Sequence, residues 1–295
     1  MDTKYDNVMV IGTGRTAFRC VEVLHRYHDK VSLLVEEREE YASAALMCKK
    51  IGIDIKEFEK GGVIHFLSEM NEKTLVISAH NGLLIPKCVI ERENLTVINM
   101  HIALLPKYRG MNAPTWEIYN MEEYGGVTWH KITPEIDKGG ILIQKKFPIG
   151  EDDIAIGVLI KSFDLGVEAL GENVSSILND EITEFYPKGE YRLYLKNELP
   201  NSGYLDETWS IRKKYAFLRS MDYRGTRIMP KPRMYKDGKE FEIWKYNRSS
   251  TPKESSGYII CEEDNEMCLN YWIREVKLFE NYEESRYTCE SNVSM

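Results

Sequence analysis

An asparagine, a histidine and an aspartate stand at positions where their side chains could act together on a carbonyl group. Asn99 and His101 are two residues apart at the end of an apolar segment, and Asp137 follows in a later turn. On an extended segment, residues two apart leave the same face. An amide donor, an imidazole and a carboxylate are the groups needed to stabilise an oxyanion and to move a proton. The chemistry indicated is transfer of an acyl group to an amine.

Each of the three residues can be given a role in such a transfer. Asn99 would supply a neutral hydrogen-bond donor to the oxyanion, and protonated His101 a charged one. Asp137 would orient the imidazolium and raise the pKa of His101 toward the working pH. His101 and Asp137 would together take the proton that the amine loses. Taken singly, these residues also have a structural explanation, because Asn can cap a turn and His can be a satisfied core residue.

The surrounding sequence predicts a sheet that brings these residues together. Short apolar runs alternate with helical patterns, which indicates a mainly parallel sheet with right-handed crossovers. The expected strands include residues 7–11, 30–35, 75–78 and 95–98. Ligands of such sheets bind beyond the carboxyl ends of the strands, where Asn99 and His101 stand. Two more strands, over residues 126–132 and 140–147, flank the turn that carries Asp137.

A glycine turn near the start of the chain allows a different interpretation. The first strand runs into Gly12-Thr-Gly14, and the second ends in Glu36. This is the pattern of a dinucleotide-binding unit, and it would make the chain an NAD(P)-dependent oxidoreductase. The same glycines also suit any doubly wound sheet whose first helix packs closely on its strand. Both interpretations stay open on this pattern alone.

The pattern of apolar and polar residues changes near residue 199. Short alternating segments follow, and Lys236-Asp237-Gly238 has the form of a hairpin turn. We therefore expect an α/β catalytic domain over residues 1–198 and a small β-rich, OB-like barrel over residues 199–295. The tail after Glu280 is polar and acidic and is expected to be less ordered.

The composition of the chain argues against a nucleic-acid-binding, membrane or metal-binding protein. The net charge of −8, and sixteen basic against sixteen acidic residues from Asn201 onward, disfavour a nucleic-acid partner. No stretch approaches the roughly 20 apolar residues of a membrane span, and no leader pattern opens the chain, so we expect a cytoplasmic protein without a membrane partner. Six cysteines are scattered without a Cys-x-x-Cys pair, which predicts no metal site.

Three separated segments, taken together, closely resemble the catalytic core of the folate-dependent formyltransferases. They are Asn99-x-His101-x-x-Leu104-Leu105-Pro106-x-x-Arg109-Gly110, Gly126-Val-Thr-x-His130 and Asp137-x-Gly139. The resemblance covers roughly residues 7–180. It implies a Rossmann-like formyltransferase domain, 10-formyltetrahydrofolate as co-substrate, and Asn99, His101 and Asp137 as the catalytic set.

The resemblance also implies where the two substrates bind. The folate would lie against the loop from Asn81 to Pro86 and the turn from Thr133 to Ile136. The implied folate-binding residues are Asn81, Gly82, Leu83, Leu84, Ile85, Leu104, Thr133, Glu135 and Ile136. For the acceptor we expect contacts from Lys107, Arg109, Asn112 and Trp129. His130 recurs in the family pattern and either supports the site or is a buried structural histidine.

One departure from the family pattern bears on the turn that carries the aspartate. The usual Asp-Thr-Gly-Asp is Asp137-Lys138-Gly139-Gly140 here, so the contacts of the second and fourth positions stay open.

The leading hypothesis is therefore an N-formyltransferase that acts on the primary amine of a small molecule. The acceptor would be a nucleotide-linked amino sugar, or an amine of the amino-acid or siderophore type. The alternatives are a methionyl-tRNA formyltransferase, a formyl hydrolase, the oxidoreductase described above and a non-catalytic binding module. Expected partners are the folate donor and the amine, and the option of a homodimer stays open.

Overall fold

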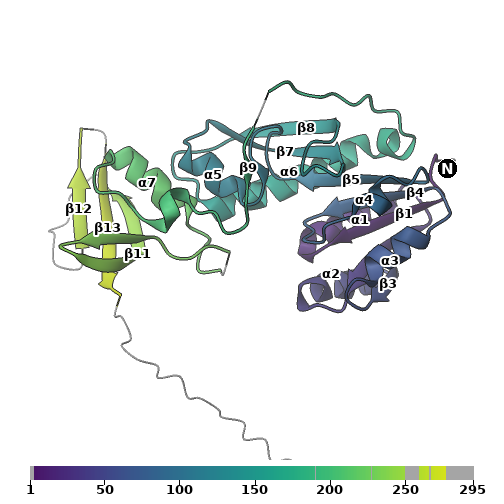
Figure 1. Cartoon of the computed structure of the whole chain (residues 1–295), viewed down its shortest axis with the longest axis horizontal. Helices are drawn as coiled ribbons and strands as arrows, with labels where there is room; N and C mark the ends of the chain where they lie inside the picture. Colours follow the sequence, from purple (N-terminus) through teal and green to yellow (C-terminus); the bar gives the residue numbers. More distant parts are fainter. Residues whose placement is uncertain (1–2, 190, 227, 250–258, 266, 277–295) are drawn as a thin grey trace, which may run out of the picture.

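A computed structural model describes residues 3–189, 191–226, 228–249, 259–265 and 267–276 of the chain. Figure 1 shows a large sheet with helices on both faces, followed by a smaller sheet at the other end of the molecule. The predicted tail after Glu280 lies outside the described residues.

The large sheet has seven strands in the order β3-β2-β1-β4-β5-β7-β8. Their bounds are β1 Asn7–Gly12, β2 Val31–Glu36, β3 Asp54–Phe58, β4 Thr74–Ala79, β5 Leu95–His101, β7 Tyr124–Lys131 and β8 Ile141–Pro148. The first five strands are parallel, whereas β7 runs antiparallel to β5 and β8 antiparallel to β7. The predicted mainly parallel, Rossmann-like sheet is confirmed.

Helices cover both faces of this sheet. They are α1 Gly14–His25, α2 Glu39–Lys50, α3 Gly62–Glu69, α4 Lys87–Ile90, α5 Ala113–Tyr119 and α6 Ala155–Leu178. In β1, Val8 and Val10 join the core that contains α1, α2 and α6, while Met9 and Ile11 join the core that contains α3 and α4. A strand buried on both faces needs a continuous apolar run, which is why residues 8–11 show no alternation.

A connecting segment leaves α6 and returns to the edge of the site. It forms a bridge between Phe185 and Ile141, and its strand β9 (Leu193–Tyr194) pairs with the short β6 (Arg109–Gly110). We call residues 183–194 the strap, excluding residue 190, which is not described. Figure 1 shows it passing over β8 and running down to β9. The strap thereby frames the turn that follows β7.

The C-terminal part begins with a 3₁₀ turn η1 (Pro200–Gly203) and helix α7 (Ile211–Ser220). Its antiparallel sheet, in the order β10-β11-β13-β12, has the bounds β10 Arg233–Lys236, β11 Lys239–Ser249, β12 Ile259–Glu263 and β13 Cys268–Glu275. Asp237 and Gly238 both have positive φ, so the predicted hairpin turn is confirmed. The expected β-rich module is present, and its described strands form one half-barrel sheet.

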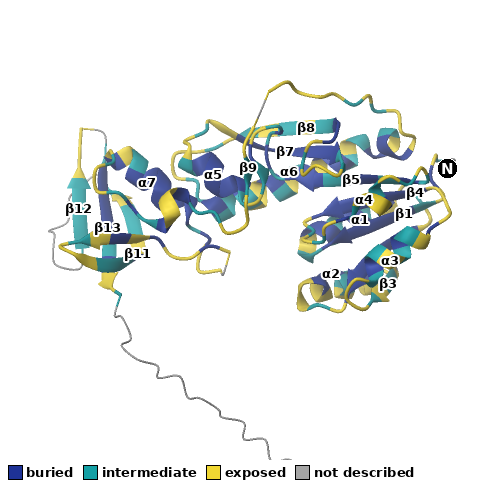
Figure 2. Ribbon diagram, in the orientation of Figure 1, coloured by how far each residue is buried: buried dark blue, intermediate teal, exposed yellow. Residues whose placement is uncertain are grey.

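Packing is continuous across the predicted boundary at residue 199. One hydrophobic cluster contains Ile118 and Val158 of the catalytic part together with Phe217 and Leu218 of α7. Figure 2 shows buried residues on α6 and α7 as well as along both sheets. The two parts therefore have separate sheets but share a core.

Among the described residues, no helix combines the length and the apolar character that a membrane crossing requires.

Candidate active site

Asn99 and His101 lie near and at the carboxyl end of β5, as predicted. Asn99 is half-buried, and His101 is 5% exposed. In the register between β5 and β7, Asn99 stands directly opposite His130. The antiparallel strand β7 thus adds a second histidine beside the predicted pair.

Asp137 reaches these residues from the turn between β7 and β8. Its Oδ2 lies 3.5 Å from Nδ1 of His101, and its Oδ1 lies 3.5 Å from Nε2 of His130. The backbone N–H of Gly110 donates to Oδ2 at 2.7 Å. The structure therefore brings together the three predicted catalytic residues and places one carboxylate between two imidazoles.

Glycine is required at two positions around this carboxylate. A Cβ atom on Gly139 would lie 1.7 Å from the carbonyl oxygen of Lys131. Gly110 has a φ of +89°, and a Cβ there would lie 2.2 Å from the carbonyl oxygen of Tyr194. A side chain at either position would displace the turn or the strap. The glycines of the Arg-Gly and Asp-x-Gly motifs thus allow the close backbone approach that delivers Asp137.

Backbone carbonyls fix the proton positions on both histidines. Nε2 of His101 lies 2.9 Å from the carbonyl oxygen of Tyr108, and Nδ1 of His130 lies 2.9 Å from that of Lys131. A carbonyl only accepts hydrogen bonds, so these two ring nitrogens carry the protons. In the neutral rings, the nitrogens that face Asp137 are therefore unprotonated.

Burial dominates the electrostatics of His101. It lowers the pKa of His101 below the ordinary value of 6.5, and the opposing effect of Asp137 does not reverse this. Asp137 thus raises the pKa of His101 as predicted, but burial outweighs this effect, so the expected net rise toward the working pH is not found. Burial alone would raise the pKa of Asp137, but His101, His130 and the Gly110 N–H together lower it well below its usual range. The resting site holds an ionised Asp137 beside a neutral His101.

The loop after β5 is tied to β7 and β8 by side chains of the second motif. The hydroxyl of Thr128 accepts from the backbone N–H of Leu105 at 3.1 Å, and Gln144 donates to the Leu105 carbonyl at 2.8 Å. A Cβ on Gly126 would lie 2.4 Å from the side chain of Leu104. Gly126 and Thr128 therefore serve to seat the loop that follows His101.

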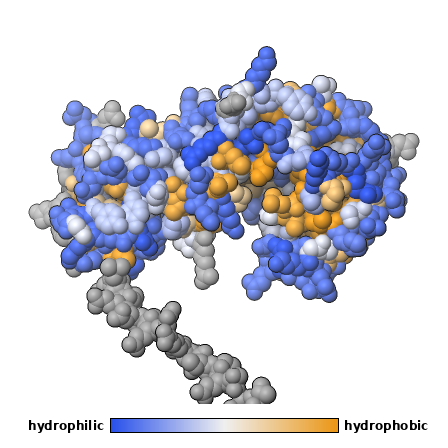
Figure 3. Space-filling view, in the orientation of Figure 1, coloured by the Kyte–Doolittle hydropathy of each residue, from blue (hydrophilic) through white to orange (hydrophobic). Residues whose placement is uncertain are grey.

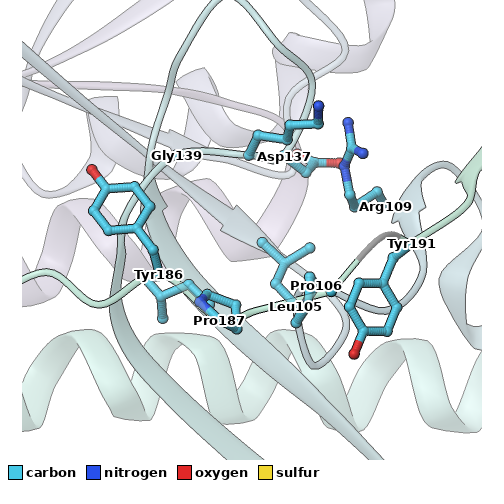
Figure 4. A pocket seen from close by; sticks show the side chains of 11 residues that line it. Leu105, Pro106, Arg109, Asp137, Gly139, Tyr186, Pro187 and Tyr191 are labelled. Atoms are coloured by element: carbon cyan, nitrogen blue, oxygen red, sulfur yellow. The ribbon is translucent and has the colours of Figure 1, made fainter.

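A cavity of about 350 Å³ opens beside Asp137. Figure 4 shows Tyr186 and Tyr191 of the strap on opposite sides of Leu105 and Pro106, with Arg109 next to Asp137. The sequence did not single out either tyrosine, because the strap carries no motif. On the face drawn in Figure 3, hydrophobic side chains gather near the middle, between the parallel strands and the region of β9.

The predicted folate-binding residues occupy two loops and the segment after β5. In the first loop, Leu84 is 80% exposed, whereas Ile85 is buried. In the turn from Thr133 to Ile136, Ile136 is 44% exposed. The remaining positions are half-buried or exposed, namely Asn81, Gly82, Leu83, Leu104, Thr133 and Glu135. Their contact with folate stays a prediction.

The predicted acceptor residues have different environments. Arg109 lines the cavity, and its Nε donates to the carbonyl of Ile136 at 2.9 Å. Lys107 forms an ion pair with Glu122, and the amide of Asn112 donates to the carbonyl of Lys196.

The assignment of Trp129 to the acceptor site is wrong. Its side chain is 0% exposed, and its indole N–H donates to the carbonyl of Gly166 in α6. Strand β7 is covered by α6 on that face, and successive residues of a strand point to opposite faces. The adjacent His130 therefore faces the site, while Trp129 belongs to the core.

The glycine turn at Gly12 has a packing role. A Cβ there would lie 1.9 Å from the carbonyl oxygen of Ala79, so glycine is needed for β1 to approach β4. Glu36, the candidate ribose ligand, is 2% exposed, forms an ion pair with Arg38 and accepts from the backbone N–H of Gly61. Its carboxylate is already bound within the protein, which removes support for the dinucleotide interpretation.

Within the part of the chain that the structure describes, no group of three or more His, Cys, Asp or Glu side chains is arranged to hold a metal ion.

Comparison with known proteins gives the chain a family context. Residues 21–170 match the family model described as formyl transferase. Methionyl-tRNA formyltransferase of Caldanaerobacter subterraneus subsp. tengcongensis is 30% identical over 179 residues, 61% of this chain and 56% of that protein. GDP-perosamine N-formyltransferase of Brucella melitensis is 32% identical over 147 residues, 50% of this chain and 56% of that protein. The matched segment thus spans about half the length of these curated relatives.

A solved structure shows the same fold over most of the chain. It is that of an N-formyltransferase from Helicobacter canadensis in complex with folinic acid and dTDP-3-aminofucose. The TM-score is 0.69, with 18% sequence identity, and the match covers 91% of this chain and 99% of that one. The likeness includes the C-terminal half-barrel as well as the large sheet.

Proposed function

The chain belongs to the formyl transferase family, and from this premise we propose that it transfers a formyl group from 10-formyltetrahydrofolate to the primary amine of a small acceptor. The observation that carries the proposal is the cluster of Asn99, His101 and Asp137 beside a cavity of about 350 Å³. Acyl transfer needs a donor to an oxyanion and an acceptor for a proton, and this cluster supplies both.

Asn99 supplies the neutral donor. Its half-buried side chain carries two N–H groups, one of which lies 3.3 Å from Nε2 of His130. The other is the group that donates to the oxygen of the formyl group as negative charge develops there. Loss of one such donor costs on the order of 10²–10³ in rate.

His101 takes the proton that the attacking amine loses. Its Nε2 is already protonated and bound to the Tyr108 carbonyl, so Nδ1 is the atom that receives the proton. The imidazolium that forms lies 3.5 Å from the ionised Asp137, which stabilises it. Asp137 thus holds the proton on His101 and does not itself need to take it up.

The two loops that the family resemblance assigns to folate fit an apolar ring system. Leu84 and Ile136 are exposed apolar side chains on these loops. Exposed leucine and isoleucine next to a polar cluster are suited to cover a planar heterocycle. Bound 10-formyltetrahydrofolate supplies the formyl group, while the residues of the chain orient the reactants and exclude water.

A nucleotide-linked amino sugar is the acceptor class that we favour. The residues that line the cavity beside Asp137 include Tyr186 and Tyr191 together with the cationic Arg109 and Lys138. Tyrosine rings pack against sugar or base faces, and cations suit the phosphates that join them. The Helicobacter protein was solved with a dTDP-linked amino sugar, which supports the same choice. Amines of the amino-acid or siderophore type remain the second acceptor class.

Methionyl-tRNA formyltransferase is the second candidate function, because the relative from Caldanaerobacter has that activity in its name. A tRNA-binding module is expected to carry an excess of basic residues. The region from Asn201 onward has sixteen basic and sixteen acidic residues, and therefore favours a small acceptor.

A turnover screen tests the proposal. Purified protein is given 10-formyltetrahydrofolate with dTDP- and GDP-linked amino sugars, hydroxyornithine or charged initiator tRNA. We expect donor consumption and an equal amount of formylated amino sugar. Donor consumption that yields formate with every amine would identify a formyl hydrolase instead. Selective formylation of the tRNA would replace the favoured acceptor.

A further inference from the structure

The orientation of the Asn99 carboxamide decides whether this residue helps or opposes the reaction. Its Nδ2 donates hydrogen bonds, whereas its Oδ1 only accepts them. A flipped carboxamide would present its oxygen to a developing oxyanion and would repel it. The site therefore needs hydrogen bonds that hold the Asn99 carboxamide with its Nδ2, and not its Oδ1, toward the substrate, because the two orientations have nearly the same shape.

We infer that Ser78 and His130 are positioning residues that lock the Asn99 carboxamide through a one-way chain of hydrogen bonds starting in the loop from Asn81 to Pro86. The inference rests on the proposed function for its kinetic consequences. The chain itself follows from hydrogen-bond chemistry.

The first links fix the direction of the chain at Asn81. The backbone N–H of Leu83 donates to Oδ1 of Asn81 at 3.0 Å, and the hydroxyl of the buried Tyr41 donates to the same oxygen at 3.3 Å. A backbone N–H cannot accept, so the oxygen of Asn81 must face it. Nδ2 of Asn81 therefore faces Ser78, and it donates to the hydroxyl oxygen at 3.4 Å.

The same donor-to-acceptor direction continues from Asn81 through the Ser78 hydroxyl to Asn99. Ser78 is 3% exposed, so water has almost no access to its hydroxyl. Because its oxygen accepts from Asn81, its single proton is free to donate onward, and Oδ1 of Asn99 lies 2.8 Å away. Asn99 thus has its oxygen bound to Ser78 and its nitrogen on the opposite side.

The far end of the chain agrees with this direction. Nδ1 of His130 must be a donor because it faces the carbonyl of Lys131, so Nε2 of the neutral ring is an acceptor. Nδ2 of Asn99 lies 3.3 Å from this nitrogen. Both ends independently require the same carboxamide orientation, which leaves one N–H of Asn99 for the substrate.

The two histidines at Asp137 consequently have different tasks. Both rings face Asp137 at 3.5 Å, but Nε2 of His130 also accepts the N–H of Asn99, whereas Nδ1 of His101 has the carboxylate alone beside it among the hydrogen bonds of the described residues. We therefore assign the proton to His101 and the positioning of Asn99 to His130. The start of the chain at Leu83 further links the geometry of the predicted folate loop to the oxyanion donor.

The test compares Ser78→Ala with Ser162→Ala. Ser162 is also buried, but its hydroxyl bonds within α6 to the Val158 carbonyl, so it is a matched loss of one buried hydroxyl. The first readout is the Asn99 side-chain amide in ¹⁵N NMR spectra, assigned by its loss in Asn99→Ala. We expect two resolved N–H resonances whose exchange with water accelerates at least about tenfold in Ser78→Ala and is unchanged in Ser162→Ala. Equal exchange rates in all three proteins would overturn the inference.

The second readout is kinetic. We expect Ser78→Ala to lower kcat about tenfold or more, toward the loss caused by removing an oxyanion donor, with little change in KM. In an Asn99→Ala background, the same substitution should change kcat less than about twofold. Multiplicative losses would mean that Ser78 acts elsewhere and would overturn the inference. A protected Asn99 amide in a protein that formylates no amine would contradict the proposed function and leave the chain of hydrogen bonds supported.

Discussion

At the scale of single residues, the site is organised around the carboxylate of Asp137 and the two imidazole nitrogens that face it. Asp137 lies 3.5 Å from each of two imidazoles, and in their neutral forms the hydrogen bonds to backbone carbonyls leave the nearer ring nitrogens unprotonated. A carboxylate that faces unprotonated nitrogens favours the arrival of a proton. A neutral His101 is therefore suited to the proposed role of base, because Asp137 would stabilise its imidazolium.

The lowered pKa of His101 predicts the acid side of the pH profile. His101 must be unprotonated to accept the proton of the amine, so activity is lost as the pH falls through its pKa. Burial has the largest effect and lowers that pKa; Asp137 and the Tyr108 carbonyl raise it, and His130 and Arg109 lower it. We expect kcat/KM, calculated for the unprotonated form of the amine, to fall with an apparent pKa below 6.5. An acid limb centred above pH 7 would contradict the assignment of His101 as a neutral base.

The sequence was informative about the proposed catalytic residues because motifs with fixed spacing carry them. Asn99, His101 and Asp137 were found in this way, whereas Ser78 was not, because a single serine in an apolar strand has no distinctive pattern. Trp129 was misassigned for a related reason. Its neighbours belong to a motif, but only the register of β7 and the position of α6 decide which face each residue takes.

At the scale of elements, close backbone approaches deliver Asp137 to β5. The turn after β7 can lie against the carbonyl of Lys131 only because Gly139 lacks a side chain. In the same way, the strap can lie against β6 only because Gly110 lacks one. The Asp-x-Gly spacing could be predicted from the sequence. The strap could not, because its contacts with β6 and β8 join segments far apart in the chain.

Substitution of Gly139 tests this element directly. A Cβ at 1.7 Å from the Lys131 carbonyl forces the turn to move, so Gly139→Ala should lower both kcat and the melting temperature. Displacement of Asp137 by about 1 Å is enough to cost on the order of 10²-fold in rate. Gly157→Ala in α6 is the control, because its Cβ would have ordinary contacts. Unchanged activity in Gly139→Ala would show that the turn does not need this approach.

Helix α5 contains a buried acid that predicts a pH-dependent stability. Glu117 is 1% exposed, and burial, followed by the charge of Glu122, raises its pKa well above 4.5. The folded protein thus keeps Glu117 protonated at pH values where the unfolded chain ionises it, so stability is lost as the pH rises above 4.5. Glu117→Gln should raise the melting temperature at pH 7 and have a smaller effect at pH 4.5. An equal effect at both pH values would contradict a protonated Glu117.

At the scale of the whole molecule, the C-terminal module is joined to the catalytic part by a common core. Phe217 of α7 is 0% exposed and packs in the cluster that includes Ile118 and Val158. The change of sequence pattern near residue 199 indicated a second module, but the sequence alone does not show whether two modules share a core. The half-barrel sheet is therefore expected to unfold together with the large one.

Truncation of Phe217 tests the shared core. Phe217→Ala should cost about 3–5 kcal/mol, as for other large buried aromatic residues. Because the core is common, we expect one cooperative unfolding transition, followed equally by near-UV and far-UV circular dichroism. Two separated transitions, with only the later one affecting folate binding, would show that the modules unfold independently.

The central claim is that the Asn99, His101 and Asp137 cluster transfers a formyl group to an amine. The most direct measurement is the mass spectrum of a nucleotide-linked amino sugar after incubation with 10-formyltetrahydrofolate and each variant. The wild-type protein and His65→Ala, which changes an exposed histidine of α3, should add one formyl group to the amine. His101→Ala and Asp137→Asn should form at least about 10² times less product. Full product formation by His101→Ala would contradict the account.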